Sequence, residues 1–105
     1  MKYSPILGIL LLIMSCKQPT FPERYKGNWR SPHDNEFITI GRSLVKYNIG
    51  DCGEYYVRES SMDKGEYVVG CTNDGSHFTY YVVWTSTEKV MNISASEIDK
   101  APQVE

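Results

Sequence analysis

The chain has 105 residues, of which 41% are hydrophobic, 12% aromatic and 23% charged. This length limits it to a single domain, because domains usually span about 100–200 residues. Its 11 basic and 13 acidic residues give a formal net charge of −2. A nucleic-acid partner is therefore not expected, because nucleic-acid-binding proteins carry a basic excess or a basic stripe.

Residues 1–16 have the layout of an export signal. Lys2 and the N-terminal amine supply a positive start, and a nearly uninterrupted apolar run extends from Ile6 to Met14. The run has the length of the apolar core of a signal peptide. It falls well short of the roughly 20 residues that a membrane-spanning helix needs.

The end of this segment, Ile13-Met14-Ser15-Cys16, is a branched aliphatic residue, any residue, a small residue and cysteine. This pattern resembles the lipobox of bacterial lipoproteins. The resemblance implies that residues 1–15 are removed as a signal peptide and that Cys16 carries the lipid. Three acyl chains would anchor the protein stably in a membrane, because one chain alone binds only marginally. In such lipoproteins an aspartate after the cysteine implies retention in the inner membrane, so Lys17 implies the outer membrane, facing the periplasm.

The rest of the chain is expected to form one β domain at residues 26–95. Residues 16–25 are the lipidated cysteine and a short tether stiffened by Pro19 and Pro22, and residues 96–105 are a polar C-terminal tail, with one helical turn expected at Ser94–Lys100.

Apolar and polar residues alternate with a period of two over several segments of the domain, which is typical of strands. The candidate strands are Glu36–Ile40, Ser43–Ile49, Glu54–Glu59, Glu66–Cys71, His77–Thr85 and Val90–Ser94. Their connections are too short for the crossovers that parallel strands need. The sequence therefore predicts an all-β fold: a small antiparallel meander of about six strands that forms a barrel or sandwich.

The fifth candidate strand predicts which side chains form the core. One set of alternate residues is apolar and is assigned to the interior: Phe78, Tyr80, Val82 and Trp84. The other set is amphipathic and is assigned to the outer face: His77, Thr79, Tyr81, Val83 and Thr85.

Gly27-Asn28-Trp29 precedes the first candidate strand. This tripeptide resembles the Gly-x-Trp signature that opens lipocalin-type barrels, in which the tryptophan closes one end of the barrel. The resemblance implies a carrier of a small apolar ligand. A barrel of six strands would be smaller than the eight-stranded kind, which just has room for side chains or one small ligand.

Two cysteines remain once Cys16 is assigned to the lipid. An even pair in a small exported domain is typical of a disulfide, so we expect a Cys52–Cys71 bridge. Placing the two cysteines opposite each other in a hairpin pairs Glu54 with Val69 and Tyr56 with Tyr67. Opposed Cα atoms lie about 4.5–5.5 Å apart, which a disulfide can span.

No catalytic or metal-binding motif stands out. His33 and His77 are 44 positions apart and lack the spacing of metal ligands. No serine lies in a nucleophile elbow. We therefore expect no metal, no cofactor and no enzymatic activity, and a hydrolase that uses the two histidines is kept as a third hypothesis.

Eight tyrosines are the remaining unusual feature. The strand pattern places Tyr56, Tyr67, Tyr81 and Val83 on one outer face beside Arg58, and tyrosine and arginine are enriched in binding hot spots. Tyrosine also simply favours half-buried strand positions. The leading hypothesis is a membrane-anchored binding module that contacts a protein partner, in an inhibitory, immunity, exclusion or assembly role. The alternative is the lipocalin-like carrier.

Overall fold

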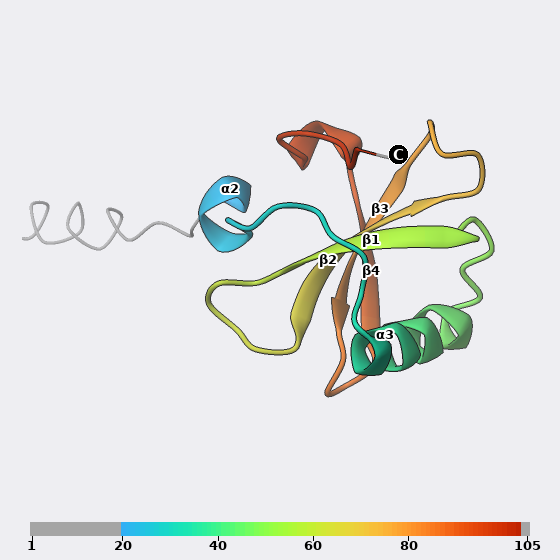
Figure 1. Ribbon diagram of the computed structural model, residues 1–105. Coiled ribbons are helices and arrows are strands. Elements are labelled where there is room, and N and C mark those ends of the chain that lie inside the picture. Colours follow the sequence, from blue (N-terminus) through green and yellow to red (C-terminus); the bar gives the residue numbers. More distant parts are fainter. Residues whose placement is uncertain (1–19, 104–105) are drawn as a thin grey trace, which may run out of the picture.

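The computed structural model describes residues 20–103, which form a four-stranded antiparallel sheet with helices packed around it (Figure 1). The strands follow one another in space as they do along the chain: β1 (Glu54–Glu59), β2 (Glu66–Thr72), β3 (Thr79–Trp84) and β4 (Lys89–Ile93). The helices are α2 (Phe21–Arg24), α3 (Asp34–Lys46) and the 3-10 turn η1 (Ala95–Glu97). The predicted signal peptide, lipobox and lipidated Cys16 lie outside the described residues.

The antiparallel meander is confirmed for the last four predicted strands, which match β1 to β4 within a few residues. The first two predicted strands, Glu36–Ile40 and Ser43–Ile49, are wrong, because most of these residues form α3. A barrel or sandwich of about six strands is therefore not confirmed: within residues 20–103 the sheet has four strands and is not closed.

The sequence forms α3 because it buries one stripe and satisfies its own first turn. Ile40, Ser43 and Leu44 are buried, and their spacing of three and four residues lies along one side of a helix. At the start, the Glu36 carboxylate accepts a hydrogen bond from the His33 backbone N–H at 2.8 Å. This contact is half of a capping box, which favours a helix over a strand at this point.

The main core lies between α3 and one face of the sheet. It is made of the following buried residues: Ile40, Leu44, Tyr55, Val57, Tyr67, Val69, Cys71, Tyr81 and Val83. Tyr81 and Val83 were predicted on the outer face, so the predicted sidedness of β3 is reversed with respect to this core. Tyr80 and Val82, predicted as core, point to the other face but are equally buried, each about 5% exposed.

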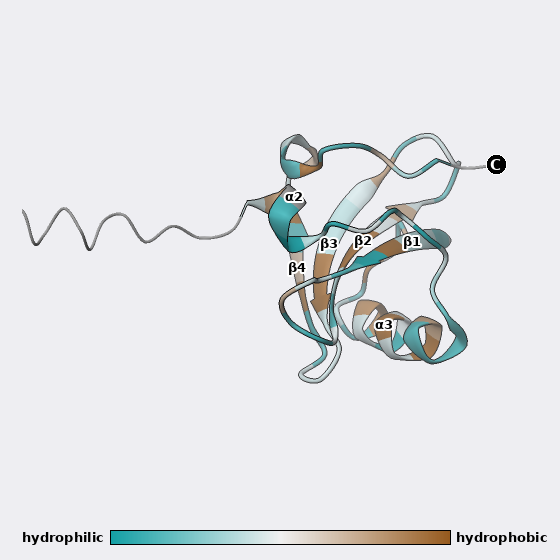
Figure 2. Cartoon of the chain, turned by 60° about the vertical axis from the view of Figure 1, so that its left-hand side comes forward, coloured by the Kyte–Doolittle hydropathy of each residue, from teal (hydrophilic) through white to brown (hydrophobic). Residues whose placement is uncertain are grey.

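Both faces of the sheet are covered, because two chain segments cross the face that α3 leaves open. Figure 2 shows α2 and the C-terminal segment on the side away from α3. Tyr25 and Pro102 are buried there, although residues 16–25 and 96–105 were predicted as a tether and a polar tail. The described parts of both segments therefore belong to the folded domain.

The two edges of the sheet differ. Beside β1, the backbone of Arg30 pairs with Val57 through hydrogen bonds of 3.0 and 2.8 Å. No strand or bridge of residues 20–103 pairs with the outer side of β4. The sheet thus has one protected edge and one that is open to pairing.

Candidate functional site

The predicted disulfide is confirmed, but it does not set the strand register as expected. Cys52 and Cys71 are bonded, with their Cα atoms 4.5 Å apart. Cys52 precedes β1, so the residue opposite Cys71 is Tyr55, and Tyr67 pairs with Glu59. The predicted partners are therefore shifted by three positions. An odd shift moves side chains to the opposite face of a sheet.

This shift divides the predicted binding face. Tyr67, Tyr81 and Val83 are buried in the core under α3. Arg58 is on the other face and only 3% exposed, and Tyr56 is half-buried on that same face. The five residues do not form a common exposed surface, so a docking surface must be sought elsewhere.

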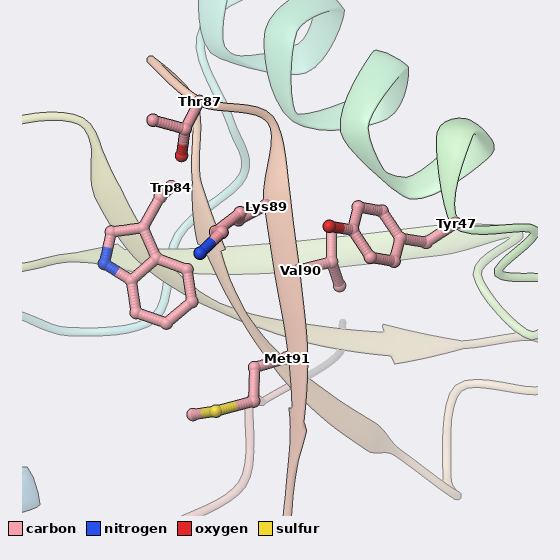
Figure 3. A pocket seen from close by; sticks show the side chains of 6 residues that line it. All are labelled: Tyr47, Trp84, Thr87, Lys89, Val90 and Met91. Atoms are coloured by element: carbon pink, nitrogen blue, oxygen red, sulfur yellow. The ribbon is translucent and has the colours of Figure 1, made fainter.

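Apolar side chains gather instead around the open edge of the sheet, where they line a depression of about 540 Å³ (Figure 3). We call this the β4 surface, and its lining residues are Tyr47, Trp84, Thr87, Lys89, Val90 and Met91. Met91 is 51% exposed and Tyr47 is 44% exposed. Exposed apolar side chains that gather in one place can mark a surface that binds a partner.

Local structure explains how the β4 surface is assembled. Val90 and Met91 are neighbours in a strand, so their side chains point to opposite faces, and apolar groups flank the open edge on both sides. Trp84 ends β3 opposite Lys89, next to Met91. Tyr47 follows the last turn of α3 and lies beside Val90 in Figure 3.

Ion pairs hold the β3–β4 turn against the helix. Glu88 lies 3.4 Å from the Lys46 ammonium and 3.8 Å from the Arg42 guanidinium. Exposed pairs of this kind contribute little to stability, typically about 0.2–1 kcal/mol. They link the two parts of the β4 surface, one from α3 and one from the sheet.

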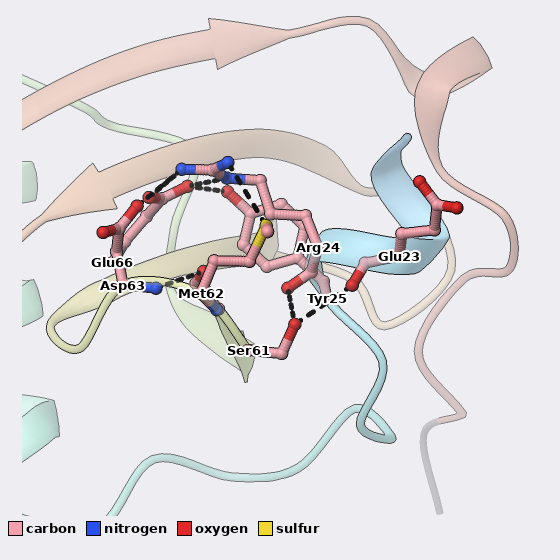
Figure 4. Close-up of polar contacts among 8 residues, drawn as sticks. Glu23, Arg24, Tyr25, Ser61, Met62, Asp63 and Glu66 are labelled. Atoms are coloured by element: carbon pink, nitrogen blue, oxygen red, sulfur yellow. Dashed lines mark hydrogen bonds and ion pairs between the residues drawn. The ribbon is translucent and has the colours of Figure 1, made fainter. Parts of the chain in front are cut away.

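A second cluster of polar groups joins α2 to the β1–β2 connection (Figure 4). Arg24 donates from Nε and Nη2 to the two carboxylate oxygens of Glu66, each at 2.8 Å, and from Nη2 to Asp63 at 2.8 Å. The Tyr25 hydroxyl also donates to Glu66. Arg24 lowers the pKa of Glu66, and burial raises the pKa of Tyr25. The cluster thus fixes a carboxylate in its ionised form.

Glu36 is held in the same way on the α3 side of the sheet, where it contacts Tyr67, the neighbour of Glu66 in β2. It accepts from Arg30 at 2.7 and 2.9 Å and from the Tyr67 hydroxyl at 2.9 Å. Hydrogen bonding to Arg30 lowers the pKa of Glu36 to about 2. A general acid needs a pKa near the working pH. Both carboxylates are therefore suited to joining segments and not to transferring protons at neutral pH.

The histidines occupy local turns. The His77 Nδ1 atom lies 2.8 Å from Asp74, which also accepts from the backbone N–H groups of Ser76 and His77. These bonds lower the pKa of Asp74. His33 precedes α3 at its N-cap. In the part of the chain that the structure describes, no three or more His, Cys, Asp or Glu side chains are grouped so that they could hold a metal ion.

The sequence analysis missed the β4 surface because it assigned Trp84 to the interior of a barrel. One signal could have revealed it. Val90-Met91 breaks the alternation of apolar and polar residues in the last predicted strand. Adjacent apolar residues in a strand place apolar side chains on both faces.

No protein-family model, curated protein or solved structure matches the chain. None of the helices found within residues 20–103 has the length and apolar character needed to cross a membrane.

Proposed function

We propose that this chain is a small, non-enzymatic binding module that acts through protein–protein contact at the β4 surface. The observation that supports it is an unpaired edge strand with exposed apolar side chains on both sides. Such an edge can accept a strand from a partner, whose backbone supplies affinity while side-chain pockets supply specificity. The covered edge at β1 offers no equivalent site.

The proposal is tested by comparing two exposed apolar positions. Met91→Arg places a long charged side chain in the β4 surface, whereas Val45→Arg does so on α3, where Val45 is 74% exposed and does not line the depression. Proteins crosslinked in cells to tagged wild-type chain and to each variant are identified by mass spectrometry. We expect a partner that is retained by Val45→Arg and lost with Met91→Arg. Identical recoveries from all three proteins would contradict the proposal.

A carrier of a small apolar ligand is the second candidate, and the volume of the depression favours it. About 540 Å³ is within the roughly 300–1,000 Å³ of small-molecule sites. The Gly27-Asn28-Trp29 resemblance adds no support, because Trp29 packs on Tyr80 across the covered face of the sheet, with ring centres 5.9 Å apart. Titration with an apolar fluorescent probe tests this candidate: saturable binding that Met91→Arg weakens and Val45→Arg leaves unchanged would favour it.

We further propose that lipid on Cys16 attaches the module to the outer membrane, on its periplasmic side. The lipobox pattern and Lys17 support this location. Mass spectrometry of the N-terminal peptide is expected to show an acylated Cys16, and Cys16→Ser is expected to move the protein from the membrane fraction to the soluble fraction. An unmodified Cys16 in the membrane fraction would refute the anchor.

A further inference from the structure

Residues 99–103, here called the strap, lie in a groove on the face of the sheet opposite α3. The groove is formed by Trp29, Arg58, Gly70 and Tyr80, which come from the segment before α3 and from β1, β2 and β3. Three different contacts hold the strap: one to the Asp99 carboxylate, one to the Lys100 carbonyl and one to the Pro102 ring. Together they indicate which residue types the groove accepts.

The first contact is a fixed positive charge. Arg58 is 3% exposed and donates from Nη1 to the Asp99 carboxylate at 2.7 Å. Its Nε donates to the Gly27 carbonyl at 2.7 Å, and its guanidinium lies 5.3 Å from the Trp29 ring centre. Arg58 is thus held by the fold itself, whereas the Asp99 side chain is 35% exposed. A carboxylate is the exchangeable member of this pair.

The second contact is a hydrogen bond to the backbone of the strap. The Trp29 indole N–H donates to the Lys100 carbonyl at 2.7 Å. A bond of this kind depends on the path of the main chain, which bends at Asp99 and Lys100, and not on the side chain at that position. Trp29 can therefore bind the residue after the carboxylate whatever the side chain at the position of Lys100 is.

The third contact is a slot for proline. A Cβ atom on Gly70 would lie 3.2 Å from the Pro102 ring and 3.2 Å from the Tyr80 ring, so a larger residue there would crowd both rings. Pro102 is buried there, whereas its neighbours Ala101 and Gln103 are exposed. The groove thus selects an acidic residue and a proline three positions later.

Open space remains beside the strap. Depressions of about 320 and 340 Å³ both include Trp29 and Gln103 in their lining, and the first extends to Arg30 and Tyr56. The groove is therefore larger than the part that residues 99–103 fill, and a longer segment could use the additional surface.

We infer that this groove is a binding site for a segment of a partner protein that carries aspartate three residues before proline and follows the bent path of the strap, and that the strap is its intramolecular competitor. A proline in such a segment restricts its backbone, so less conformational freedom is lost on binding. An internal competitor lowers the apparent affinity by the fraction of time for which the groove is open. The site is separate from the β4 surface and does not depend on the function proposed for it.

The test uses the full chain and a peptide with the sequence of residues 98–105, labelled with a fluorophore. Two control peptides carry Asn in place of Asp99 or Ala in place of Pro102. They are titrated against wild-type protein and against an Asp99→Asn, Pro102→Ala variant with a weakened strap. We expect the variant to bind the native peptide at least about tenfold more tightly than the wild type, since its groove is open more often. Each control peptide is expected to bind at least about tenfold more weakly, because a buried charge or a shaped slot is left unfilled.

Circular dichroism establishes that the variant is folded before its binding is interpreted. A folded variant that binds no peptide, or binds all three equally, would overturn the inference. If the variant does not fold, the indole N–H signal of Trp29 in wild-type protein reports the exchange: a shift with excess native peptide but not with the Asn control supports the site, and no shift refutes it. If the wild-type chain forms a dimer and the native peptide dissociates it, the groove binds a second copy of this chain. That result would overturn the inference of a different partner protein.

Discussion

At the scale of single residues, this domain uses charged side chains to join segments that are distant in sequence. Arg58, Glu36 and Glu66 each bind groups from at least one other element, at separations of up to 42 positions. Every buried side-chain nitrogen or oxygen of the described residues has a hydrogen-bond partner. Removing one member of such a pair lowers the free energy of unfolding by more than the intact pair contributes to it, because the other member stays buried without its partner.

Arg58→Met is therefore expected to destabilise the protein strongly. The substitution keeps an apolar stem but leaves Asp99 and the carbonyls of Tyr25 and Gly27 without their donor. We expect a loss of about 1–3 kcal/mol in the free energy of unfolding, measured by urea denaturation. Arg42→Met is the matched control, since Arg42 is exposed and forms only a 3.8 Å ion pair, and is expected to change stability by less than about 0.5 kcal/mol. Equal effects of the two substitutions would contradict this assignment.

The lowered pKa of Glu36 predicts how the free energy of unfolding changes with acid. Its pKa is lowered from 4.5 to about 2 in the folded protein, chiefly by Arg30. A lowered pKa stabilises the folded state above the unfolded pKa, and this stabilisation is lost as the pH falls from about 4.5 towards 2. Because the side chain is only 14% exposed, the loss is on the order of 3 kcal/mol.

The measurement is urea unfolding of wild-type protein and of Glu36→Gln at pH 7, 4 and 2.5. The variant is expected to be less stable at pH 7 and to approach the wild type as the pH falls. Other carboxylates with lowered pKa values, such as Glu66 and Asp99, act equally in both proteins, so the difference isolates Glu36. A difference that does not change with pH would show that Glu36 is not the titrating group.

At the scale of elements, the four strands could be predicted and the helix was missed, for a physical reason. Residues 36–49 contain β-branched residues at Ile38, Thr39, Ile40 and Val45, which favour strands, and Gly41 suggested a turn. Residues 34–46 form a helix because this buries Ile40 and Leu44 along one side. That burial requires the face of the sheet, which comes from later parts of the chain and leaves no signal in the local sequence. Asp34 and Glu36, both acidic residues of the first turn, marked the helix start in the sequence.

The binding face could not be predicted for a related reason. The bounds of β1 and β2 were predicted to within one residue, but the register between them was inferred from two cysteines placed in opposition. Because Cys52 lies before β1, that inference was three residues out, and Tyr67 moved to the core face. Alternation defines two sets of side chains in each strand, but only tertiary contacts decide which set faces the helix.

Two glycines provide a prediction about elements. Gly41 is inside α3, and an added Cβ would meet only the Tyr55 hydroxyl at 3.6 Å, an ordinary contact. Gly41→Ala is therefore expected to stabilise the protein by about 0.5–1 kcal/mol. Gly70→Ala is the contrasting variant and is expected to destabilise it, because its Cβ would press on Pro102 and Tyr80. Melting temperatures that move in the same direction would contradict this assignment.

At the scale of the whole molecule, a sheet of four strands is covered on both faces by a chain of limited length. The main core between α3 and the sheet is made of only nine buried residues, and the opposite face is closed by α2 and the strap. Small domains bury a low fraction of their surface, so they often need a covalent link to be stable. The Cys52–Cys71 bond supplies this link at the end of the sheet where β1 begins and β2 ends.

Reduction of this disulfide is therefore expected to cost a large share of the stability. The bond joins residues 19 positions apart, and closing a loop of this size contributes about 3 kcal/mol in the chain-entropy model. A typical domain has only about 5–15 kcal/mol in total. Wild-type protein unfolded in urea with and without dithiothreitol gives the difference without changing any side chain, and mass spectrometry after alkylation verifies that both thiols are free.

Because the other end of the β1–β2 hairpin is held by Arg24 and Glu66, reduction together with Glu66→Gln is expected to prevent folding, whereas either change alone is not. Coincident urea midpoints for oxidised and reduced protein would show that packing on the two faces is sufficient without the covalent link.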